Sequence, residues 1–276
     1  MRFLMVFLIL VFGGQAAGEE WATIDFPESN YTDIRAIENG KIIGNHSIVY
    51  ESFSYTYDGV EWETLDLPGG VSAADGNNIV GNDQPHGFLY DGVSVIPIVC
   101  PIMNGTSVND IDGANIVGGY RSGDEGYGYI YDGQDWVTIN RPGPARQELL
   151  YVTGIDGNKL VGNYWDPDSV KWRGFISEGN NWTFVDSPDG SPITVFGVDG
   201  DAVVGISGDH GFVLDGESWE TIAFPGATLT EVFGRKEGKV FGRYRDDSSF
   251  YHGFIYTADP TNVEKKSMGN VKSMFR

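Results

Sequence analysis

One pattern of apolar and polar positions recurs six times along the chain. Each copy begins with a β-branched residue and a small residue two positions later. A tight turn follows, usually Asp-Gly, and then an apolar pair that ends in Gly. The fourth copy shows the pattern most clearly at 151–162, and an aromatic strand at 173–177 and a Trp strand at 182–185 complete it. A fixed period of this kind indicates a repeat architecture. Each copy predicts four short strands, named a to d in chain order.

The first two strands of each copy carry three matched columns. Strand a has a β-branched column at Ile34, Val71, Val108, Val152, Val195 and Val232. Two residues later the side chains are mostly small, which suggests that another backbone lies close by; this column is Ala36, Ala73, Asp110, Gly154, Gly197 and Gly234. Strand b has Gly in every copy, although Gly weakens a strand by about 0.5–1 kcal/mol. Its recurrence predicts close approach of a neighbouring sheet at Gly44, Gly81, Gly118, Gly162, Gly205 and Gly242.

The last two strands set the order of each sheet. Strand c carries an aromatic column at Tyr55, Phe88, Tyr129, Phe175, Phe212 and Phe254. Strand d opens with Trp in most copies and leaves through Pro-containing segments such as 67–70 and 224–227. Pro is tolerated on an edge strand but not inside a sheet. Strand d is therefore expected at the outer edge of a four-stranded antiparallel sheet.

These patterns predict an all-β fold, a six-bladed β-propeller of four-stranded antiparallel blades. Small sheets with two apolar faces bury those faces against one another around an axis. A β-sandwich is the alternative, but it gives no reason for six similar units. The chain starts with a d-type strand at 21–26, and the sixth copy stops after its c strand at 251–256. We therefore expect the N-terminal strand to pair with the last blade and close the ring.

The amino terminus is typical of a secretory signal peptide. Arg2 precedes an apolar run from Phe3 to Phe12, and small residues follow at 16–18. This run is too short for a membrane span, which needs about 20 residues. We expect a signal peptide at 1–18, cleaved near Ala17 or Gly18, one propeller domain at 19–258 and a mobile tail at 259–276. The mature protein is then secreted or periplasmic and has no membrane span.

Charge and cysteine content narrow the classes of partner. The formal net charge is −21, from 39 acidic and 18 basic residues. Such a surface repels phosphate backbones and anionic lipids, so nucleic acid is excluded as a partner. Cys100 is the single cysteine, so no intramolecular disulfide forms. We expect Cys100 to be a buried small apolar side chain and not a nucleophile.

A triplet at the start of strand c carries a resemblance to a known family. It occurs at His86-Gly-Phe88, His210-Gly-Phe212 and His252-Gly-Phe254, and with other residues at 53–55, 127–129 and 173–175. With the turn motif before it, the chain resembles the extracellular HAF repeats, named after a His-Ala-Phe triplet, over about residues 31–257. The resemblance implies a secreted bacterial-type repeat protein and transfers no catalytic residue.

The turns between strands b and c hold most of the chemistry-bearing side chains. They vary in length, and variable loops on a rigid scaffold are the usual place for binding. The candidate ligand-binding residues are Asp83, His86, Asp124, Trp165, Asp166, Asp168, Arg173, Asp209, His210, Asp246, Asp247 and His252.

No cofactor is expected from these turns. The repeat histidines lie on strands too far apart to share one metal ion. The acidic segments 166–168 and 246–249 offer oxygen ligands to calcium. They lack a complete ligand spacing, so solvated loops are favoured and calcium is the alternative. Trp165 and Trp172 either stack on a sugar or pack on a blade edge. The sequence has no phosphate loop, no Gly-x-Ser-x-Gly elbow and no His-Glu-x-x-His motif.

The sequence thus predicts a secreted binding or interaction module that acts through the loop face of a propeller. The expected partner is a carbohydrate or a protein, and we expect a monomer. Two alternatives stay open: a propeller enzyme acting on carbohydrate, and a surface or matrix structural protein. The enzyme requires paired carboxylates near the axis.

Overall fold

The computed structural model describes residues 11–13, 20–49, 51–101, 105–122, 125–140 and 149–258. The predicted tail, the candidate residue Asp124 and the predicted signal peptide, apart from β1 (Val11–Gly13), lie outside these ranges. All the regular elements in the described ranges are β-strands. No helix in the described ranges is long and apolar enough to cross a membrane.

Four copies of the repeat form separate four-stranded antiparallel blades. In each blade the strands pair in chain order, so strand d lies at the edge, as predicted. The blades are β7 (Gly70–Asp75), β8 (Asn78–Asp83), β9 (His86–Tyr90) and β10 (Val95–Ile98); β11 (Thr106–Asp112), β12 (Asn115–Ser122), β13 (Glu125–Tyr131) and β14 (Trp136–Ile139); β15 (Leu150–Asp156), β16 (Lys159–Asp166), β17 (Lys171–Glu178) and β18 (Asn181–Val185); and β19 (Ile193–Asp199), β20 (Ala202–Ser207), β21 (His210–Asp215) and β22 (Ser218–Ile222).

The first and last copies share one nine-stranded sheet. The first copy contributes β3 (Tyr31–Glu38), β4 (Lys41–Ile48), β5 (Glu51–Tyr57) and β6 (Trp62–Leu65), and the last contributes β23 (Leu229–Lys236), β24 (Lys239–Arg245) and β25 (Tyr251–Thr257). β2 (Glu20–Ile24) pairs antiparallel with β25, with Trp21 opposite Tyr256, and β1 pairs with the other edge of β2.

The predicted fold class is therefore wrong as stated. We expected six separate blades, and hydrogen bonding defines four. β25 is bridged to β3 through Tyr251 and Tyr31, and the Tyr251 amide donates to the carbonyl of Asn30. The short segment between β2 and β3 holds the start of β3 beside β25, so the two copies merge. The N-terminal strand β2 does pair with β25, but it lies inside the merged sheet. A separate sixth blade that this strand closes is not supported.

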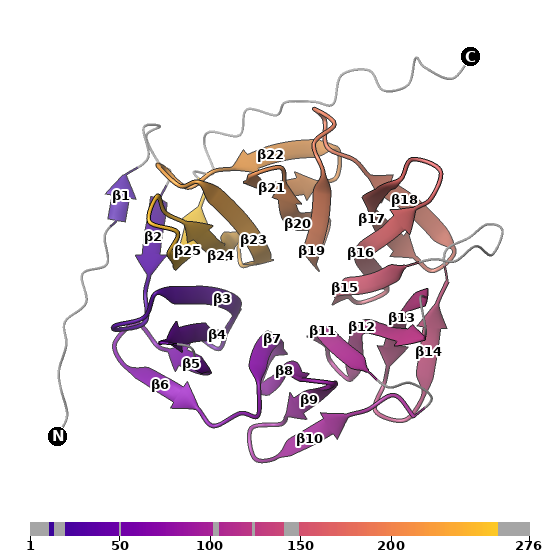
Figure 1. Cartoon of the computed structure of the whole chain (residues 1–276), viewed down its shortest axis with the longest axis horizontal. Coiled ribbons are helices and arrows are strands. Elements are labelled where there is room, and N and C mark those ends of the chain that lie inside the picture. The colour runs from indigo at the N-terminus through magenta and orange to yellow at the C-terminus, as the bar shows by residue number, and fades with distance from the viewer. Residues whose placement is uncertain are drawn as a thin grey trace.

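The sheets stand around a central axis and form a β-propeller (Figure 1). The first strand of each copy lies nearest the axis, and the fourth lies on the outside. Neighbouring sheets bury their apolar faces against each other. For example, Val161 of β16 packs with Val195 and Phe212 of the following blade, all fully buried. Cys100 is buried and free, as predicted.

The Gly column of strand b has a different cause from the one we predicted. A Cβ at Gly162 would lie 2.1 Å from the carbonyl oxygen of Tyr151 and 2.7 Å from the Phe175 ring. Both neighbours belong to the same blade; the equivalent glycines all meet a strand a carbonyl of their own sheet, and all but Gly242 also meet the strand c aromatic side chain. The crowding therefore comes from strand a and the aromatic column within the sheet. The small residues of strand a do lie against the backbone of the next copy, as predicted. A Cβ at Gly154 would lie 3.0 Å from the Cα of Gly197.

Asparagine side chains join neighbouring sheets. In three copies, an Asn directly after the strand b Gly donates to the carbonyl of the β-branched residue of the next strand a. It also accepts from the amide of that residue. The pairs are Asn45 with Val71, Asn82 with Val108, and Asn163 with Val195, at 2.7–2.9 Å. Each Asn therefore gives partners to backbone groups at the start of the next inner strand, and the carbonyl of Val195 also accepts from the Thr153 hydroxyl.

Candidate functional site

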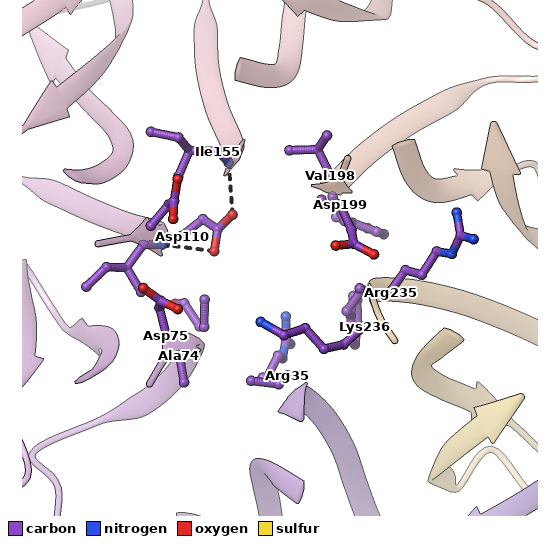
Figure 2. Close-up of a pocket in the computed structure, with 18 of the residues that line it drawn as sticks. Arg35, Ala74, Asp75, Asp110, Ile155, Val198, Asp199, Arg235 and Lys236 are labelled. Atoms are coloured by element: carbon purple, nitrogen blue, oxygen red, sulfur yellow. Dashed lines mark hydrogen bonds between the residues drawn. The ribbon is translucent and has the colours of Figure 1, made fainter. Parts of the chain in front are cut away.

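A cavity of about 390 Å³ lies on the axis of the propeller, between the innermost strands. The first strand of every copy contributes to its wall. Figure 2 shows Asp75 and Asp110 on one side of the cavity and Asp199 and Lys236 on the other. A cavity of this size falls in the range that holds small-molecule ligands.

A β-bulge in each innermost strand places one extra side chain in the cavity wall. The register shifts directly after the β-branched residue in every copy, for example between Ile34 and Ala36. Bulges re-aim side chains and are common next to functional sites. The bulge residues all line the cavity and differ strongly in character: Arg35, Ser72, Asn109, Thr153, Phe196 and Phe233.

A ring of turn carboxylates surrounds one end of the cavity. In three of the four Asp-Gly turns between strands a and b, the Asp carboxylate accepts a hydrogen bond from the Gly amide of the next copy. The pairs are Asp75 with Gly113 at 2.8 Å, Asp112 with Gly157 at 2.6 Å, and Asp156 with Gly200 at 2.5 Å. The hairpin role predicted for these dipeptides is correct, and the carboxylates in addition link neighbouring sheets. Asp199 follows the same spacing, but no hydrogen bond to its carboxylate is found among the described residues. Burial raises the pKa of Asp199, and Arg235 opposes this shift.

Asp110 is the one acidic residue in the small column of strand a. Its carboxylate accepts hydrogen bonds from the amides of Ile111 and Ile155, both at 2.9 Å, and so bridges two neighbouring sheets. Burial raises its pKa to about 7, against the effect of these two bonds. A carboxyl group that titrates near neutral pH in a cavity is a candidate for ligand contact.

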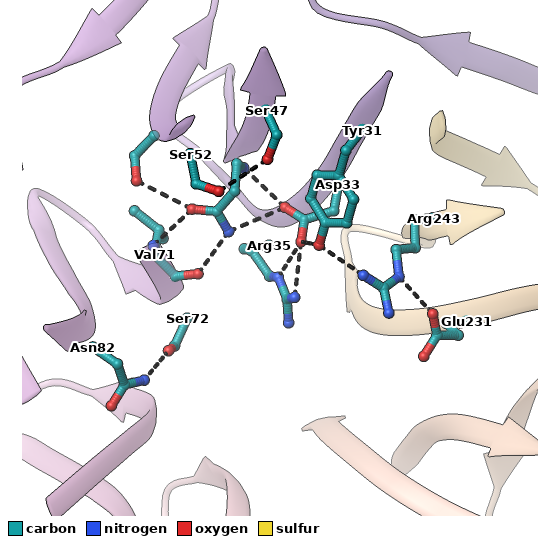
Figure 3. A network of polar contacts seen from close by, with 12 residues as sticks. Tyr31, Asp33, Arg35, Ser47, Ser52, Val71, Ser72, Asn82, Glu231 and Arg243 are labelled. Atoms are coloured by element: carbon teal, nitrogen blue, oxygen red, sulfur yellow. Dashed lines mark hydrogen bonds and ion pairs between the residues drawn. The ribbon is translucent and has the colours of Figure 1, made fainter. Parts of the chain in front are cut away.

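A network of charged side chains lies where the first and last copies meet (Figure 3). Asp33 is fully buried and accepts from Tyr31, from Arg35 and from the backbone amide and side chain of Asn45. Arg243 donates to Glu231 and, at 2.7 Å, to the Tyr31 hydroxyl. Neutral residues occupy most of these positions in the other copies.

Arg35 extends this network to the cavity wall. Its Nε and Nη2 atoms both lie 2.8 Å from Oδ2 of Asp33, and its guanidinium stacks over the Phe233 ring at 4.0 Å. The side chain keeps 27% of its surface exposed. The carboxylate of Asp33 supports a raised pKa for Arg35 against the opposing effect of burial, so this group carries a fixed positive charge.

The residues predicted from the b–c turns do not come together at one site. They form three local groups, each within one copy or its closing strand. Asp166 lies 3.7 Å from Arg173, which also pairs with Asp186. Trp165 packs edge-on against Trp172, a contact that does not decide between the sugar-stacking and blade-edge alternatives.

In the last copy, His252 lies 2.9 Å from Asp25 and 3.4 Å from Asp246. The bond to Asp25 is the main cause of the raised pKa of His252. Asp83 and His86 face each other across a turn, and Asp168, Asp209, His210 and Asp247 lie at or beside exposed turns. Within the described ranges, no group of three or more His, Cys, Asp or Glu residues is arranged to hold a metal ion.

The carboxylates that line the axial cavity test the alternative that the protein is a carbohydrate-cleaving enzyme. Several of them converge on the cavity, as a carbohydrate-cleaving enzyme would need. However, Asp75, Asp112 and Asp156 each bind a neighbouring turn, and Asp110 holds two backbone amides. These contacts use the carboxylates to join sheets, so the enzyme alternative is not favoured.

Sequence reasoning missed the cavity residues because the bulges interrupt the alternation of strand a. A signal was nevertheless present. Asp110 interrupts a column of Ala and Gly, and Arg35 stands where other copies have Ser, Asn, Thr or Phe. These charged residues, which replace neutral ones at a fixed repeat position, both line the cavity.

The fold and the axial cavity define the protein as a β-propeller with a central pocket. No protein-family profile matches the sequence, and no curated protein matches it. Solved propeller structures are similar at 11% identity. The β-propeller domain of the Trilobed protease from Pyrococcus furiosus matches 92% of this chain and 88% of its own, with a TM-score of 0.54. Acylaminoacyl peptidase from Pyrococcus horikoshii matches 86% of this chain with a TM-score of 0.52. This chain spans 46% of that peptidase. These likenesses show the fold alone.

Proposed function

We propose that this protein is an exported binding module that holds a small polar molecule in its axial cavity. The observation that carries the proposal is the cavity itself, about 390 Å³ in volume and lined by the first strand of every copy. Its wall combines carboxylates, cations and apolar side chains. Half of the lining residues are polar or charged, so the wall suits a polar ligand better than an apolar one.

The loop face supports a binding role less well. Some of its candidate residues already form local ion pairs, as Arg173 does with Asp166 and Asp186 and His252 does with Asp25. The candidates also lie in separate copies. A carbohydrate or protein partner on that face remains the second candidate, favoured by the half-exposed Trp172 and Phe184 of one copy.

Export rests on the amino-terminal sequence pattern described above. The intact mass of the protein recovered outside the cytoplasm tests it. A mass that corresponds to cleavage near Ala17 or Gly18 supports export, and a full-length intracellular product contradicts it.

A cavity-filling variant tests the site of binding. Ser72 lines the cavity at a bulge position where two other copies carry Phe196 and Phe233, so Ser72→Phe is compatible with the local backbone. The probes are a panel of small amines, carboxylates, zwitterions and neutral sugars, screened by thermal shift and then by calorimetry. We expect a binder whose affinity falls at least about tenfold in Ser72→Phe. Val93→Phe, at a turn residue that is 89% exposed, is the matched control and should bind normally. Equal binding by wild type and Ser72→Phe contradicts the axial site.

A further inference from the structure

The axial cavity has a fixed cation at one level and carboxylates at another. The cation is Arg35, at the bulge of β3. Three residues further along each strand, toward the turns, lie the carboxylates of Glu38, Asp75, Asp112, Asp156 and Asp199 and, in the last copy, the cation of Lys236. At about 3.3 Å per residue, the backbone positions of the two levels are roughly 10 Å apart along a strand. Between them the wall has the apolar side chains of Ile155 and Val198 and the charged side chains of Asp110 and Arg235, and Phe196 and Phe233 lie at the bulge level beside Arg35.

The guanidinium of Arg35 is held in place before any ligand arrives. Asp33 binds two of its nitrogens, and the Phe233 ring supports its face. No hydrogen bond from the third nitrogen, Nη1, is found among the described residues. A planar guanidinium fixed in this way is suited to a carboxylate, since the contact needs no reordering of the side chain.

The turn end retains acceptors for a cation. Asp75, Asp112 and Asp156 each use Oδ2 for the neighbouring Gly amide, and no hydrogen bond to Oδ1 of these residues is found in the described part of the chain. The Asp199 carboxylate accepts no hydrogen bond there, although burial raises its pKa and Arg235 and Lys236 lie near enough to oppose this rise, and Lys236 donates to Glu38 at 2.8 Å. A primary ammonium group has three donors and can bind several such oxygens at once.

Building on the proposed function, we propose that the axial cavity binds a short zwitterion. Its carboxylate binds Arg35, and its ammonium group binds the turn carboxylates at Asp199. The spacing of roughly 10 Å matches an extended chain of about three residues at 3.3–3.6 Å each. The ligand class is therefore a free-ended short peptide or an ω-amino acid of similar length. Both charged ends are recognised, and the side chains of Ile155 and Val198 contact the part between them.

Calorimetry with four related probes tests this assignment. Triglycine carries both charges at the matching length. Triglycine amide lacks the carboxylate, N-acetyl-triglycine lacks the ammonium group, and 6-aminohexanoate keeps both charges without peptide bonds. We expect triglycine or 6-aminohexanoate to bind at least about tenfold more tightly than either single-charge probe. Binding of triglycine alone identifies a peptide ligand, and binding of both identifies the zwitterion as the recognised feature.

Two cavity variants test which residue binds each charged end of the ligand. Arg35→Gln should abolish the preference for triglycine over triglycine amide, and Asp199→Asn should abolish the preference over N-acetyl-triglycine. If Arg35→Gln does not fold because Asp33 loses its partner, Arg35→Lys keeps the charge and should retain part of the preference. Lys171→Gln removes an exposed cation, 52% accessible and remote from the cavity, and should leave all four affinities unchanged.

The outcomes separate the two proposals. If triglycine amide binds as tightly as triglycine and 6-aminohexanoate, recognition of a zwitterion is wrong while an axial binding site survives. A second outcome also rejects only the zwitterion assignment. In it, none of these four probes binds, but another compound of the earlier panel binds the wild type and does not bind Ser72→Phe. If nothing in either set binds, both proposals fail.

Discussion

His46 is a residue whose replacement should stabilise the protein. It is 2% exposed, and neither ring nitrogen has a hydrogen-bond partner among the described residues. Its ring stacks on Phe26 with a centroid distance of 3.5 Å. In the last copy the same stack is made by Tyr244 on Phe224, at 3.7 Å. An imidazole therefore occupies a place that a phenol fills elsewhere, and it leaves two polar atoms buried and unpaired.

The hydroxyl that His46 lacks has a partner in the equivalent positions. Tyr244 lies 3.2 Å from the Thr23 hydroxyl, and Tyr120 lies 2.8 Å from that of Thr138. In the first copy, Thr64 occupies the position that is equivalent to Thr138. Thr64 lies opposite Tyr55 of strand c, just as Thr138 lies opposite Tyr129. A tyrosine at position 46 is thus expected to reach Thr64.

The size of the effect of His46→Tyr follows from these contacts. An unpaired buried polar group costs about 1–3 kcal/mol, and a new hydrogen bond contributes about 1 kcal/mol. We expect the free energy of unfolding to rise by about 2 kcal/mol. For a domain of this size, that corresponds to roughly 4–8 °C in Tm.

The gain should also depend on pH. Burial lowers the pKa of His46 in the folded state. Below about pH 6.5 the unfolded chain takes up a proton at this histidine while the folded protein does not, so the wild type loses stability as the pH falls. His46→Tyr removes this loss. Urea unfolding at about pH 7 and about pH 5 measures it, and the difference between variant and wild type should be larger at the lower pH.

The reverse substitution is the matched control. Tyr120→His removes a buried hydroxyl from an equivalent pair and should destabilise the protein, with a larger loss at low pH. A His46→Tyr protein that is less stable than wild type at both pH values would refute this interpretation of the repeat. So would a Tyr120→His protein whose stability is unchanged.

Three further predictions concern single side chains. Asn163→Ala leaves the buried amide of Val195 without a partner, while the Val195 carbonyl keeps the Thr153 hydroxyl, so urea unfolding should show a loss of about 1–3 kcal/mol; an unchanged midpoint would show that Asn163 does not join the sheets. Asp25→Asn removes the main cause of the raised pKa of His252, so an NMR titration should show that pKa falling toward its ordinary value. Asp110 titrates at about 7 in the fold and near 4 when unfolded, so its burial lowers stability progressively as the pH rises between those values. Asp110→Ala should remove roughly 2–4 kcal/mol of this pH dependence, and an unaltered slope between about pH 4 and pH 7 would show that Asp110 is ionised throughout.

Much of the fold was predictable because the repeat aligns residues with the same physical role. The β-branched column became the buried inner strand, with Val152 and Val195 fully buried. The aromatic column became the fully buried centre of each blade, as at Phe175 and Phe212. Pro-containing exits correctly placed strand d at the edge. Such columns report burial and strand order within one copy, which local sequence determines.

Contacts between copies were harder to predict. The merging of the first and last sheets depends on the bridge from Tyr251 to Tyr31, and these residues are 220 positions apart. The Gly column was recognised, but it was attributed to the wrong neighbour, because a pattern shows that space is short and not which atom fills it. The Asn after Gly recurs in three copies, yet its partner lies in the next sheet.

The candidate site was largely missed for a related reason. Turn residues such as Asp166 and His252 were selected for their chemistry, but they pair with their own neighbours at Arg173 and Asp25. The cavity is instead lined at bulge positions, where the two-residue alternation of a strand fails. Arg35 and Asp110 were visible as departures from the repeat, and such departures are the better guide to function here.

Methyl-group NMR during titration with a bound ligand tests the central claim, binding inside the axial cavity, most directly. The methyl signals of Ile111, Ile155 and Val198 in the cavity wall should shift with saturation. Those of Val49 and Val170, exposed on the b–c turns, should not move. Shifts confined to Val49 and Val170 would place the ligand on the loop face and contradict an axial binding site.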